Sequence, residues 1–133
     1  MIIGLGTDIV RTSRIKLLSE KYGLKFLDRI LTKDEQAKYN AMEDTSQKEA
    51  YLTKRFAAKE AFVKAIGTGF DGNISFQDIS VLNDKSGKPY YNLSDKLDKH
   101  IKKLFDLKKY LTHISISDDV KYASAVAIIE KIE

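Results

Sequence analysis

Two acidic residues and one lysine have the types and spacing for phosphate chemistry. Asp8 lies in an apolar N-terminal segment, and Glu60 and Lys64 stand four residues apart in "KRFAAKEAFVKAIGTG", residues 54–69. The chain has no cysteine and only two histidines, so a site built on two carboxylates would favour a hard cation. Mg²⁺ takes one or two carboxylates, keeps several waters and completes its shell from substrate phosphates. If the protein binds a metal, we therefore expect Mg²⁺ at Asp8 and Glu60.

The surroundings of Glu60 and Lys64 are unusually apolar for a charged pair. On a helical wheel both residues lie among Phe56, Ala57, Ala61 and Val63, whereas an amphipathic surface helix has a broad polar face. Ionised groups flanked by core residues lose solvation worth several kcal/mol, which predicts that something polar meets them. The simpler alternative is a surface i,i+4 pair worth about 0.3–0.5 kcal/mol.

A second basic strip, Arg55 and Lys59, lies about a third of a turn away on the same predicted helix. The planar fork of an arginine suits phosphate oxygens, so this strip is a candidate phosphate contact. A solvated stripe on the helix surface explains the spacing equally well.

Asp8 alternates with Gly4 and Gly6 along a predicted strand, so its face carries few side chains and a backbone or a ligand can approach. Asp8 could equally cap the helix that follows. A dinucleotide fingerprint is excluded, because Ile9 stands where G-x-G-x-x-G needs its last glycine, and the chain has no P-loop.

The first half of the chain predicts one strand and four helices. The strand covers residues 2–10, and Thr12 or Ser13 caps a helix that Gly23 ends; a short helix with Phe26, Leu27 and Ile30 follows. The capping-box patterns "TKDE" and "SQKE" predict helices near 33–42 and 47–66. The second of these is long and ends at "GTGFDG", residues 67–72, whose glycines allow positive φ.

The second half predicts two hairpins and one helix. "ISFQDISVLND" and "YYNL" form a hairpin across "KSGKP", and "YLTHISISD" and "KYASAVAIIEKI" form another. Between them, Ser94 or Asp95 caps a helix with four residues facing inward: Leu97, Ile101, Leu104 and Phe105. The sequence therefore predicts an α+β fold, a single domain over residues 1–133 with antiparallel sheet, a long central helix and several short helices.

Composition narrows the class of protein. The 23 Lys and Arg exceed the 19 Asp and Glu, a net charge of +4 that favours acidic partners without the density of a dedicated nucleic-acid binder. The start "MIIGLGTDIV" lacks the basic and long apolar regions of a signal peptide, and no run approaches the roughly 18 apolar residues of a membrane span. We expect a cytoplasmic protein without membrane insertion.

Four blocks together resemble a known family. "IGLGTDIV", "RFAAKEAFVKAIGTG", "SGKPY" and "HISISDDVKYASAVAIIE" stand in the order and spacing of the holo-acyl-carrier-protein synthases, the bacterial type of 4′-phosphopantetheinyl transferase. The resemblance spans nearly the whole chain. It implies transfer of the 4′-phosphopantetheine arm of coenzyme A to a serine of apo acyl carrier protein, with Mg²⁺ required and adenosine 3′,5′-bisphosphate released, as a step in fatty acid biosynthesis.

The resemblance also assigns residues. It implies that Asp8 and Glu60 hold Mg²⁺ and that Lys64 lies beside the diphosphate. It places Arg55, with Lys59, near the 3′-phosphate. Further coenzyme A contacts would come from Gly67, Thr68 and Gly69 and from Gly87, Lys88 and Pro89. Asp8, Glu60 and Lys64 are then the catalytic residues, and the choice of base between Glu60 and a water stays open.

The resemblance implies a homotrimer with coenzyme sites between subunits. The small residues of the glycine face and of the alanine stripe at Ala57, Ala58, Ala61 and Ala65 would allow such an approach, and packing within one subunit explains them as well. The chain departs from the family at Asp118, where the family has histidine after Ser-x-Ser; a carboxylate there would repel coenzyme phosphates. His113 lies on the same strand face as Ser115 and Ser117, and we expect it to have a structural role.

An early basic run predicts where an acidic carrier protein docks. Its members are Arg11, Arg14, Lys16, Lys21, Lys25 and Arg29, opposed only by Glu20 and Asp28. Arg14, Lys21 and Lys25 come close to one helical face if Gly23 only bends the chain, and Phe26 could add an apolar anchor. A solvated face is the alternative. For the whole protein, the competing class is a non-enzymatic module that binds a nucleotide or nucleic acid with Arg55, Lys59 and this run, without needing Asp8 or Glu60.

Overall fold

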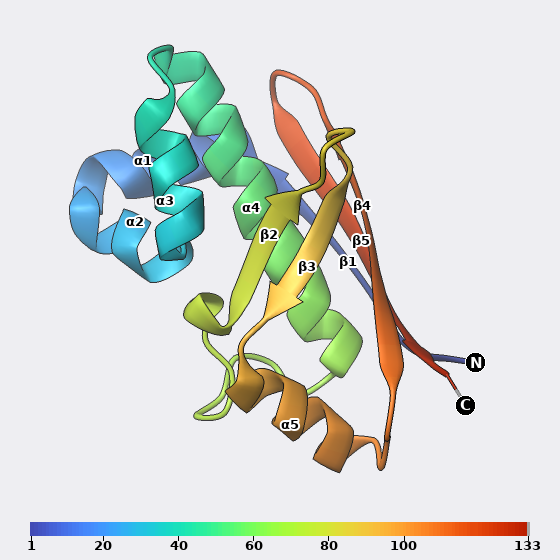
Figure 1. Ribbon diagram of the computed structural model, residues 1–133. Helices are drawn as coiled ribbons and strands as arrows, with labels where there is room; N and C mark the ends of the chain where they lie inside the picture. Colours follow the sequence, from blue (N-terminus) through green and yellow to red (C-terminus); the bar gives the residue numbers. More distant parts are fainter. Residues whose placement is uncertain (133) are drawn as a thin grey trace.

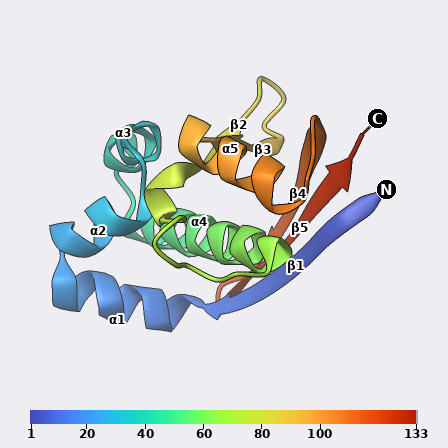
Figure 2. The same cartoon turned by 90° about the horizontal axis from the view of Figure 1, so that it is seen from below.

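The structure, a computed structural model that describes residues 1–132, is built around the long helix α4 (Thr45–Ile66). On one side of α4 lies a three-stranded antiparallel sheet in the order β1 (Ile2–Arg11), β5 (Tyr122–Lys131), β4 (Tyr110–Asp118) (Figure 1). On the other lies the hairpin of β2 (Ile79–Asn83) and β3 (Pro89–Leu93). Figure 2 shows α4 between these two layers. Because both sides are covered, α4 has no broad polar face. The α+β prediction is confirmed.

Short helices cover the ends of this sandwich. They are α1 (Thr12–Tyr22), α2 (Leu24–Ile30), α3 (Lys33–Ala41) and α5 (Asp95–Leu104), with a 3₁₀ turn, η1 (Phe76–Asp78), before β2. The first three gather at one end of the molecule, and α5 lies at the other (Figure 1). Helix α5 is capped by Ser94, whose hydroxyl accepts from the Leu97 amide at 3.1 Å. Of the two predicted caps, Ser94 and Asp95, the structure therefore has Ser94.

Two predicted helix starts are wrong. Helix α1 follows Arg11 without a side-chain cap, so neither Thr12 nor Ser13 caps it, and Asp8 lies within β1. Helix α4 begins at Thr45, because the Asp44 carboxylate accepts from the Ser46 amide at 2.7 Å and starts the helix ahead of "SQKE". The capping box of "TKDE" is confirmed.

Two burial and strand predictions also need correction. The segment before β2 turns as η1 instead of continuing the strand, and it is closed by Asp78, which accepts from the Ser75 amide at 2.9 Å. Leu104 is 44% exposed, whereas Leu97 and Ile101 are fully buried. A helical wheel predicts which face points inward but not whether the neighbouring layer reaches the last residue of the helix.

The glycine face of β1 lies against α4. A side-chain carbon at Gly6 would collide with the Ala61 carbonyl and the Ala65 amide, and one at Gly4 with the Ala65 carbonyl. The glycines therefore allow the backbone of α4, in the same chain, to come close to β1. This close packing sets the distance from β1 to the last turns of α4.

The other face of the three-stranded sheet is uncovered. Leu5 and Ile9 of β1 are 62% and 67% exposed, and Leu111 of β4 is 46% exposed. Between them β5 presents Val126 and Ile128, which pair across to β1 and β4. Polar side chains share this face, since His113 of β4 pairs with Ile128 and Glu130 of β5 pairs with Leu111. Among residues 1–132, no helix combines the length and apolar character that a membrane crossing needs.

Candidate active site

Asp8 and Lys64 meet across the junction of β1 and α4. The Lys64 ammonium lies 3.0 Å from Oδ1 of Asp8, whose side chain is 14% exposed while that of Lys64 is 56% exposed. The close packing of β1 on α4 allows this contact between residues far apart in sequence. Lys64 thus pairs with the strand, and the alternative of a simple surface pair with Glu60 is not what the structure forms.

Glu60 lies one helical turn before Lys64 and is half-buried. Burial is the largest cause that raises the pKa of Glu60, and the Asp8 carboxylate raises it further, while Lys64 and Arg14 act in the opposite direction. A carboxylate with a raised pKa is a better proton acceptor near neutral pH than an ordinary glutamate. The three catalytic candidates from the sequence are therefore brought together.

The two carboxylates fit a divalent cation that keeps waters. Within residues 1–132, Oδ2 of Asp8 is buried and has no hydrogen-bond partner, although its other oxygen is paired with Lys64. In the same residues, no group of three or more acidic, His or Cys side chains could enclose a metal. Two carboxylates with an unused oxygen match Mg²⁺, whose remaining positions come from water and phosphate.

Glu60 opens onto a cleft of about 450 Å³ between α1, α2 and α4. Its floor is aromatic, since Phe56 and Phe76 stack with ring centroids 5.6 Å apart, and the Arg14 guanidinium lies 5.6 Å from the Phe56 ring centroid. Lys25 and Arg29 also line it. A carboxylate with a raised pKa beside an apolar, basic-rimmed cleft is the arrangement expected of an active site.

The predicted docking residues divide between this cleft and the surface. Gly23, at φ 55°, ends α1 and starts α2, so Arg14, Lys21 and Lys25 do not share one bent helix. Arg14 and Lys25 line the cleft, and Lys21 lies outside it over the ring of Tyr22. Phe26 is only 9% exposed and contributes to the cleft wall. Leu17 and Leu24 are the most exposed apolar side chains of these two helices, at 67% and 75%. The sequence analysis did not identify them, although they are seven residues apart.

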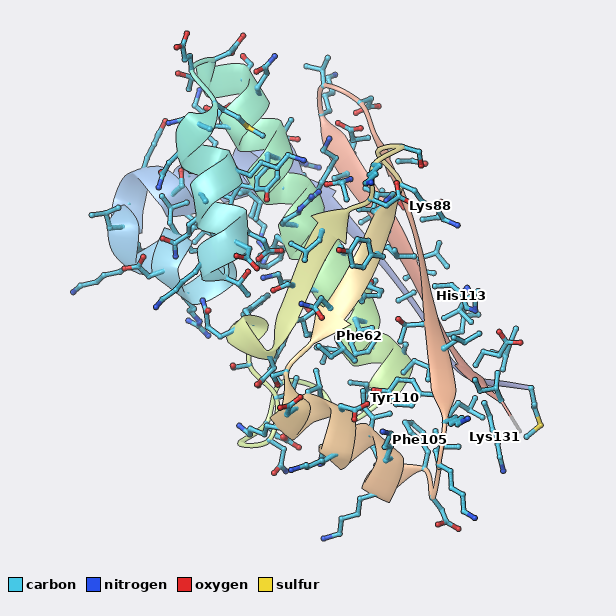
Figure 3. The ribbon with its side chains drawn as sticks, viewed as in Figure 1. Phe62, Lys88, Phe105, Tyr110, His113 and Lys131 are labelled. Carbon is cyan, nitrogen blue, oxygen red and sulfur yellow. The ribbon has the colours of Figure 1, made fainter. Side chains whose placement is uncertain are left out.

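Arg55 is buried beside the β2–β3 turn. Its Nη2 donates to Oδ1 of Asn83 at 2.6 Å, and the Asn83 amide donates to the Gly87 carbonyl at 2.9 Å. The guanidinium lies 4.4 Å from the Tyr51 ring centroid, and its Nε is buried without a partner among the described residues. The structure thus joins Arg55 to the "GKP" segment through Asn83. No pattern in the sequence pointed to Asn83 as the bridging residue. Lys88 is exposed near the tip of this hairpin (Figure 3).

Lys59 is fully buried, and its ammonium is bound by protein acceptors. The alternative of a solvated Arg55–Lys59 stripe is therefore wrong. A non-enzymatic module gripping a nucleotide with Arg55 and Lys59 would need the Lys59 ammonium to be free, and its three protein acceptors remove that residue from the support for this class. Glu35 is the fully buried partner of Lys59. The sequence pattern predicted only its role in the capping box.

The remaining candidates lie at loops and strand ends. Gly67 ends α4 at φ 93°, and with Thr68 and Gly69 it forms an exposed loop that leads to Phe70. Asp118 is exposed at the end of β4. His113 points from the outer face of the sheet and lies 2.9 Å from Glu130, as a structural histidine would (Figure 3).

Comparisons with known proteins agree with this geometry. The family model described as "4'-phosphopantetheinyl transferase superfamily" matches residues 4–126. A holo-[acyl-carrier-protein] synthase from Wolbachia pipientis is 46% identical over 97% of this chain and 98% of its own length. The crystal structure of that synthase from Neisseria meningitidis has a TM-score of 0.88 at 39% identity, covering 98% and 100% of the two chains.

A second similar solved structure is that of a complex with a ligand. The holo-(acyl-carrier-protein) synthase from Bacillus anthracis, described in complex with CoA (3',5'-ADP), has a TM-score of 0.82 at 35% identity and 99% coverage of both chains. The sequence matches and the structural matches therefore indicate the same family along nearly the whole chain. This chain belongs to the 4′-phosphopantetheinyl transferase superfamily.

Proposed function

We propose that this protein is a holo-acyl-carrier-protein synthase, which transfers 4′-phosphopantetheine from coenzyme A to a serine of apo acyl carrier protein. The single observation that carries the proposal is the cluster of Asp8, Glu60 and Lys64, of which Glu60 lines the cleft, in a chain of this family. The test is incubation with apo carrier protein, coenzyme A and Mg²⁺. Intact mass spectrometry should show one phosphopantetheine added per carrier, and an unmodified carrier would overturn the proposal.

The chemistry is an in-line phosphoryl transfer. The serine oxygen forms a bond to the β-phosphorus of coenzyme A, the bond from that phosphorus to the bridging oxygen breaks, and adenosine 3′,5′-bisphosphate leaves. Glu60 or a water accepts the serine proton, and the raised pKa of Glu60 supports that role. Lys64, more than half exposed and held by Asp8, places its positive charge where the leaving phosphate gains negative charge.

Asp8 and Glu60 would hold Mg²⁺. The unpartnered Oδ2 of Asp8 and the mutual repulsion of the two carboxylates support this assignment. When bound there, Mg²⁺ would polarise the diphosphate and neutralise part of its charge. Asp8 would then serve two positive partners, since its Oδ1 is paired with Lys64 and its Oδ2 is free to accept a cation.

Coenzyme A would be held at two places on α4. Arg55 with Gly87, Lys88 and Pro89 would meet the 3′-phosphate, and Lys64 with the loop at residues 67–69 would meet the diphosphate. Residues 55 and 67 are separated along α4 by about 18 Å at 1.5 Å per residue. Arg55 and Lys64 also point from opposite sides of the helix, Arg55 toward Asn83 and Lys64 toward Asp8. One coenzyme would therefore be held by residues of two neighbouring subunits.

This separation supports a homotrimer. The uncovered sheet face, with its exposed Leu5, Ile9 and Leu111, offers each subunit a surface that association would bury. In a cytoplasmic setting, the product would be the holo carrier protein for fatty acid biosynthesis. Light scattering of the purified protein tests the trimer independently of activity.

A further inference from the structure

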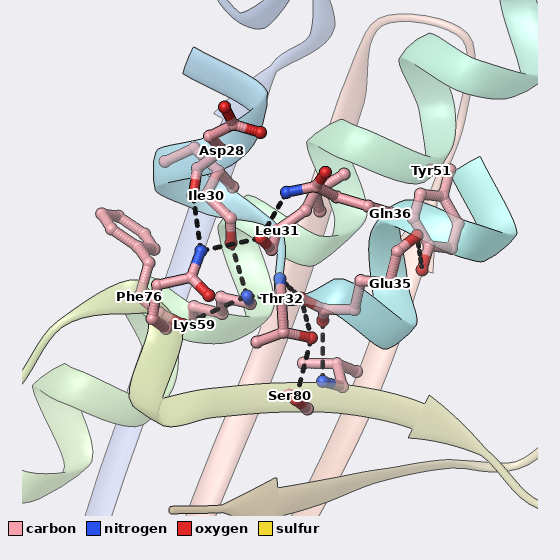
Figure 4. Close-up of polar contacts among 12 residues, drawn as sticks. Asp28, Ile30, Leu31, Thr32, Glu35, Gln36, Tyr51, Lys59, Phe76 and Ser80 are labelled. Carbon is pink, nitrogen blue, oxygen red and sulfur yellow. Dashed lines mark hydrogen bonds and ion pairs between the residues drawn. The ribbon is translucent and has the colours of Figure 1, made fainter. Parts of the chain in front are cut away.

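The ammonium of Lys59 is one of the most fully enclosed charges of the molecule. Its Nζ lies 2.6 Å from Oε1 of Glu35 and donates to the carbonyls of Ile30 at 2.5 Å and Phe76 at 3.2 Å, so all three of its protons have acceptors (Figure 4). Lys59 and Glu35 are both fully buried. Burial is the largest effect on the pKa of Lys59 and lowers it, while Glu35 opposes that shift.

Glu35 has a role that does not depend on Lys59. Its Oε1 accepts from the Thr32 amide at 2.8 Å, and its Oε2 accepts from the Val81 amide at 2.8 Å. These bonds fix the start of α3 to strand β2. Lys59 is therefore more than a countercharge for Glu35, because two of its three bonds go to main-chain carbonyls elsewhere.

Those two carbonyls belong to residues of the cleft wall. Ile30 ends α2, Phe76 begins η1, and both line the cleft together with Glu60. Lys59 immediately precedes Glu60 on α4. One helical turn therefore carries the carboxylate of Glu60 and, on another side, the Lys59 ammonium, which binds the Ile30 and Phe76 carbonyls together; we call these two bonds the clamp. The clamp joins α2 and η1, which Gln77 also links through bonds to Asp28 and Leu31.

We infer that Lys59 is a positioning residue for transfer, one that fixes the Ile30 and Phe76 walls of the cleft relative to Glu60. This inference rests on the proposed function and replaces a phosphate contact for Lys59 by an indirect role. These walls share the cleft with Arg14 and Lys25, the residues proposed to meet the carrier protein, whereas Arg55, Lys64 and the glycine loops are the residues proposed to hold coenzyme A. Loss of the clamp should therefore impair the carrier protein reaction and spare coenzyme A affinity.

A double variant separates positioning from simple charge balance. Lys59→Met leaves the Glu35 charge buried without its cation, and such breakage commonly costs about 3–5 kcal/mol. Lys59→Met with Glu35→Gln removes both charges, and Glu35→Gln alone is its reference, because the new side-chain amide has a single oxygen and can accept from only one of the Thr32 and Val81 amides. The double variant should be more stable than Lys59→Met alone, yet the Ile30 and Phe76 carbonyls remain without their donor.

Steady-state kinetics at equal folded fraction tests the inference, with the wild-type protein showing transfer in the same assay. Relative to Glu35→Gln, the double variant should lose about 10- to 100-fold in kcat/KM for carrier protein while the KM for coenzyme A stays within about twofold, since small misplacements next to a reacting group have effects of this size. Tyr91→Phe is the matched control, because it removes a buried hydroxyl bond to the Ala58 carbonyl of the same helix, away from the cleft.

The outcomes are distinct. A double variant with wild-type kcat/KM would show that Lys59 serves only to balance Glu35, and a raised KM for coenzyme A alone would show a direct coenzyme contact; either overturns the inference. Amide hydrogen exchange supplies a readout without activity: residues 24–30 and 76–79, which exclude the two amides bound by Glu35, should exchange faster in the double variant than in Glu35→Gln or Tyr91→Phe. Unchanged exchange there would also contradict the clamp. If the wild type itself fails to modify carrier protein, the proposed function fails instead.

Discussion

The Lys64 ammonium and the Asp8 carboxylate, 3.0 Å apart, connect the last turns of α4 to the middle of β1. The contact depends on a strand whose inner face has glycine at two successive inward positions, because larger residues would push β1 away from the helix. A salt bridge of this exposure contributes little stability, about 0–1 kcal/mol. Its value is geometric, since it orients Asp8 beside Glu60.

Gly6→Ala tests the packing that brings these residues together. The new methyl group would overlap the Ala61 carbonyl and the Ala65 amide, so the free energy of unfolding should fall by about 1–3 kcal/mol. Gly72→Ala is the control, because a side chain at Gly72 meets open space and its φ is not positive. Urea denaturation that gives equal stabilities for the two variants would contradict the close approach of β1 to α4.

Asp78→Asn tests the pH dependence of the η1 anchor. Burial raises the pKa of Asp78, but hydrogen bonds from Ser94 and Ser75 outweigh it and leave the pKa below its ordinary value. The carboxylate therefore stabilises the fold above the unfolded-state pKa of about 3.9, and this contribution is lost as the pH falls through the folded-state pKa. The variant should unfold at lower urea than wild type at pH 7, and the gap should close in acid. A gap that stays constant as the pH is lowered through the acid range would show that the charge is irrelevant.

Asp118→His tests the departure from the family pattern that the sequence resemblance implies at residue 118. The exposed carboxylate would repel coenzyme phosphates, so its replacement should leave kcat unchanged and lower the KM for coenzyme A by about two- to fivefold, the size of an exposed charge effect. Initial rates at varied coenzyme A measure this. A higher KM would reveal a compensating role for Asp118.

Arg14→Glu with Lys21→Glu tests docking of the acidic carrier protein on α1. Surface charges of this kind chiefly speed encounter, so the KM for carrier protein should rise about tenfold at low salt, lose its salt dependence, and leave the KM for coenzyme A unchanged. Because Arg14 lines the cleft and Lys21 does not, Lys21→Glu alone isolates docking from the site. Wild-type kinetics in both variants at every salt concentration would place the docking surface elsewhere.

Local chemistry in the sequence predicts much of the fold. The capping box at Thr32, the glycine stop at Gly67 and the turn at residues 85–89 each depend on neighbours in the chain, and the structure has all three. The start of α4 was misplaced because two competing caps, Asp44 and Ser46, lie two residues apart.

The site was predictable only in part, since its decisive contacts join distant segments. Residue type and helical spacing singled out Asp8, Glu60 and Lys64, yet the Asp8–Lys64 pair spans 56 positions and no local rule supplies it. Lys59 could not be recognised as buried, because its partner Glu35 lies 24 residues away on another helix and its other acceptors are main-chain carbonyls.

The most direct test of the account is the rate of phosphopantetheine transfer by Asp8→Asn and Glu60→Gln, measured by intact mass at ordinary Mg²⁺. Each change keeps the shape of the side chain and removes a charged ligand, so the fold should remain intact by circular dichroism. Transfer should fall by about 10²–10³-fold in each variant, as it does when one stabilising contact to a developing charge is lost. Wild-type rates in either variant would contradict a metal-assisted site at Asp8 and Glu60.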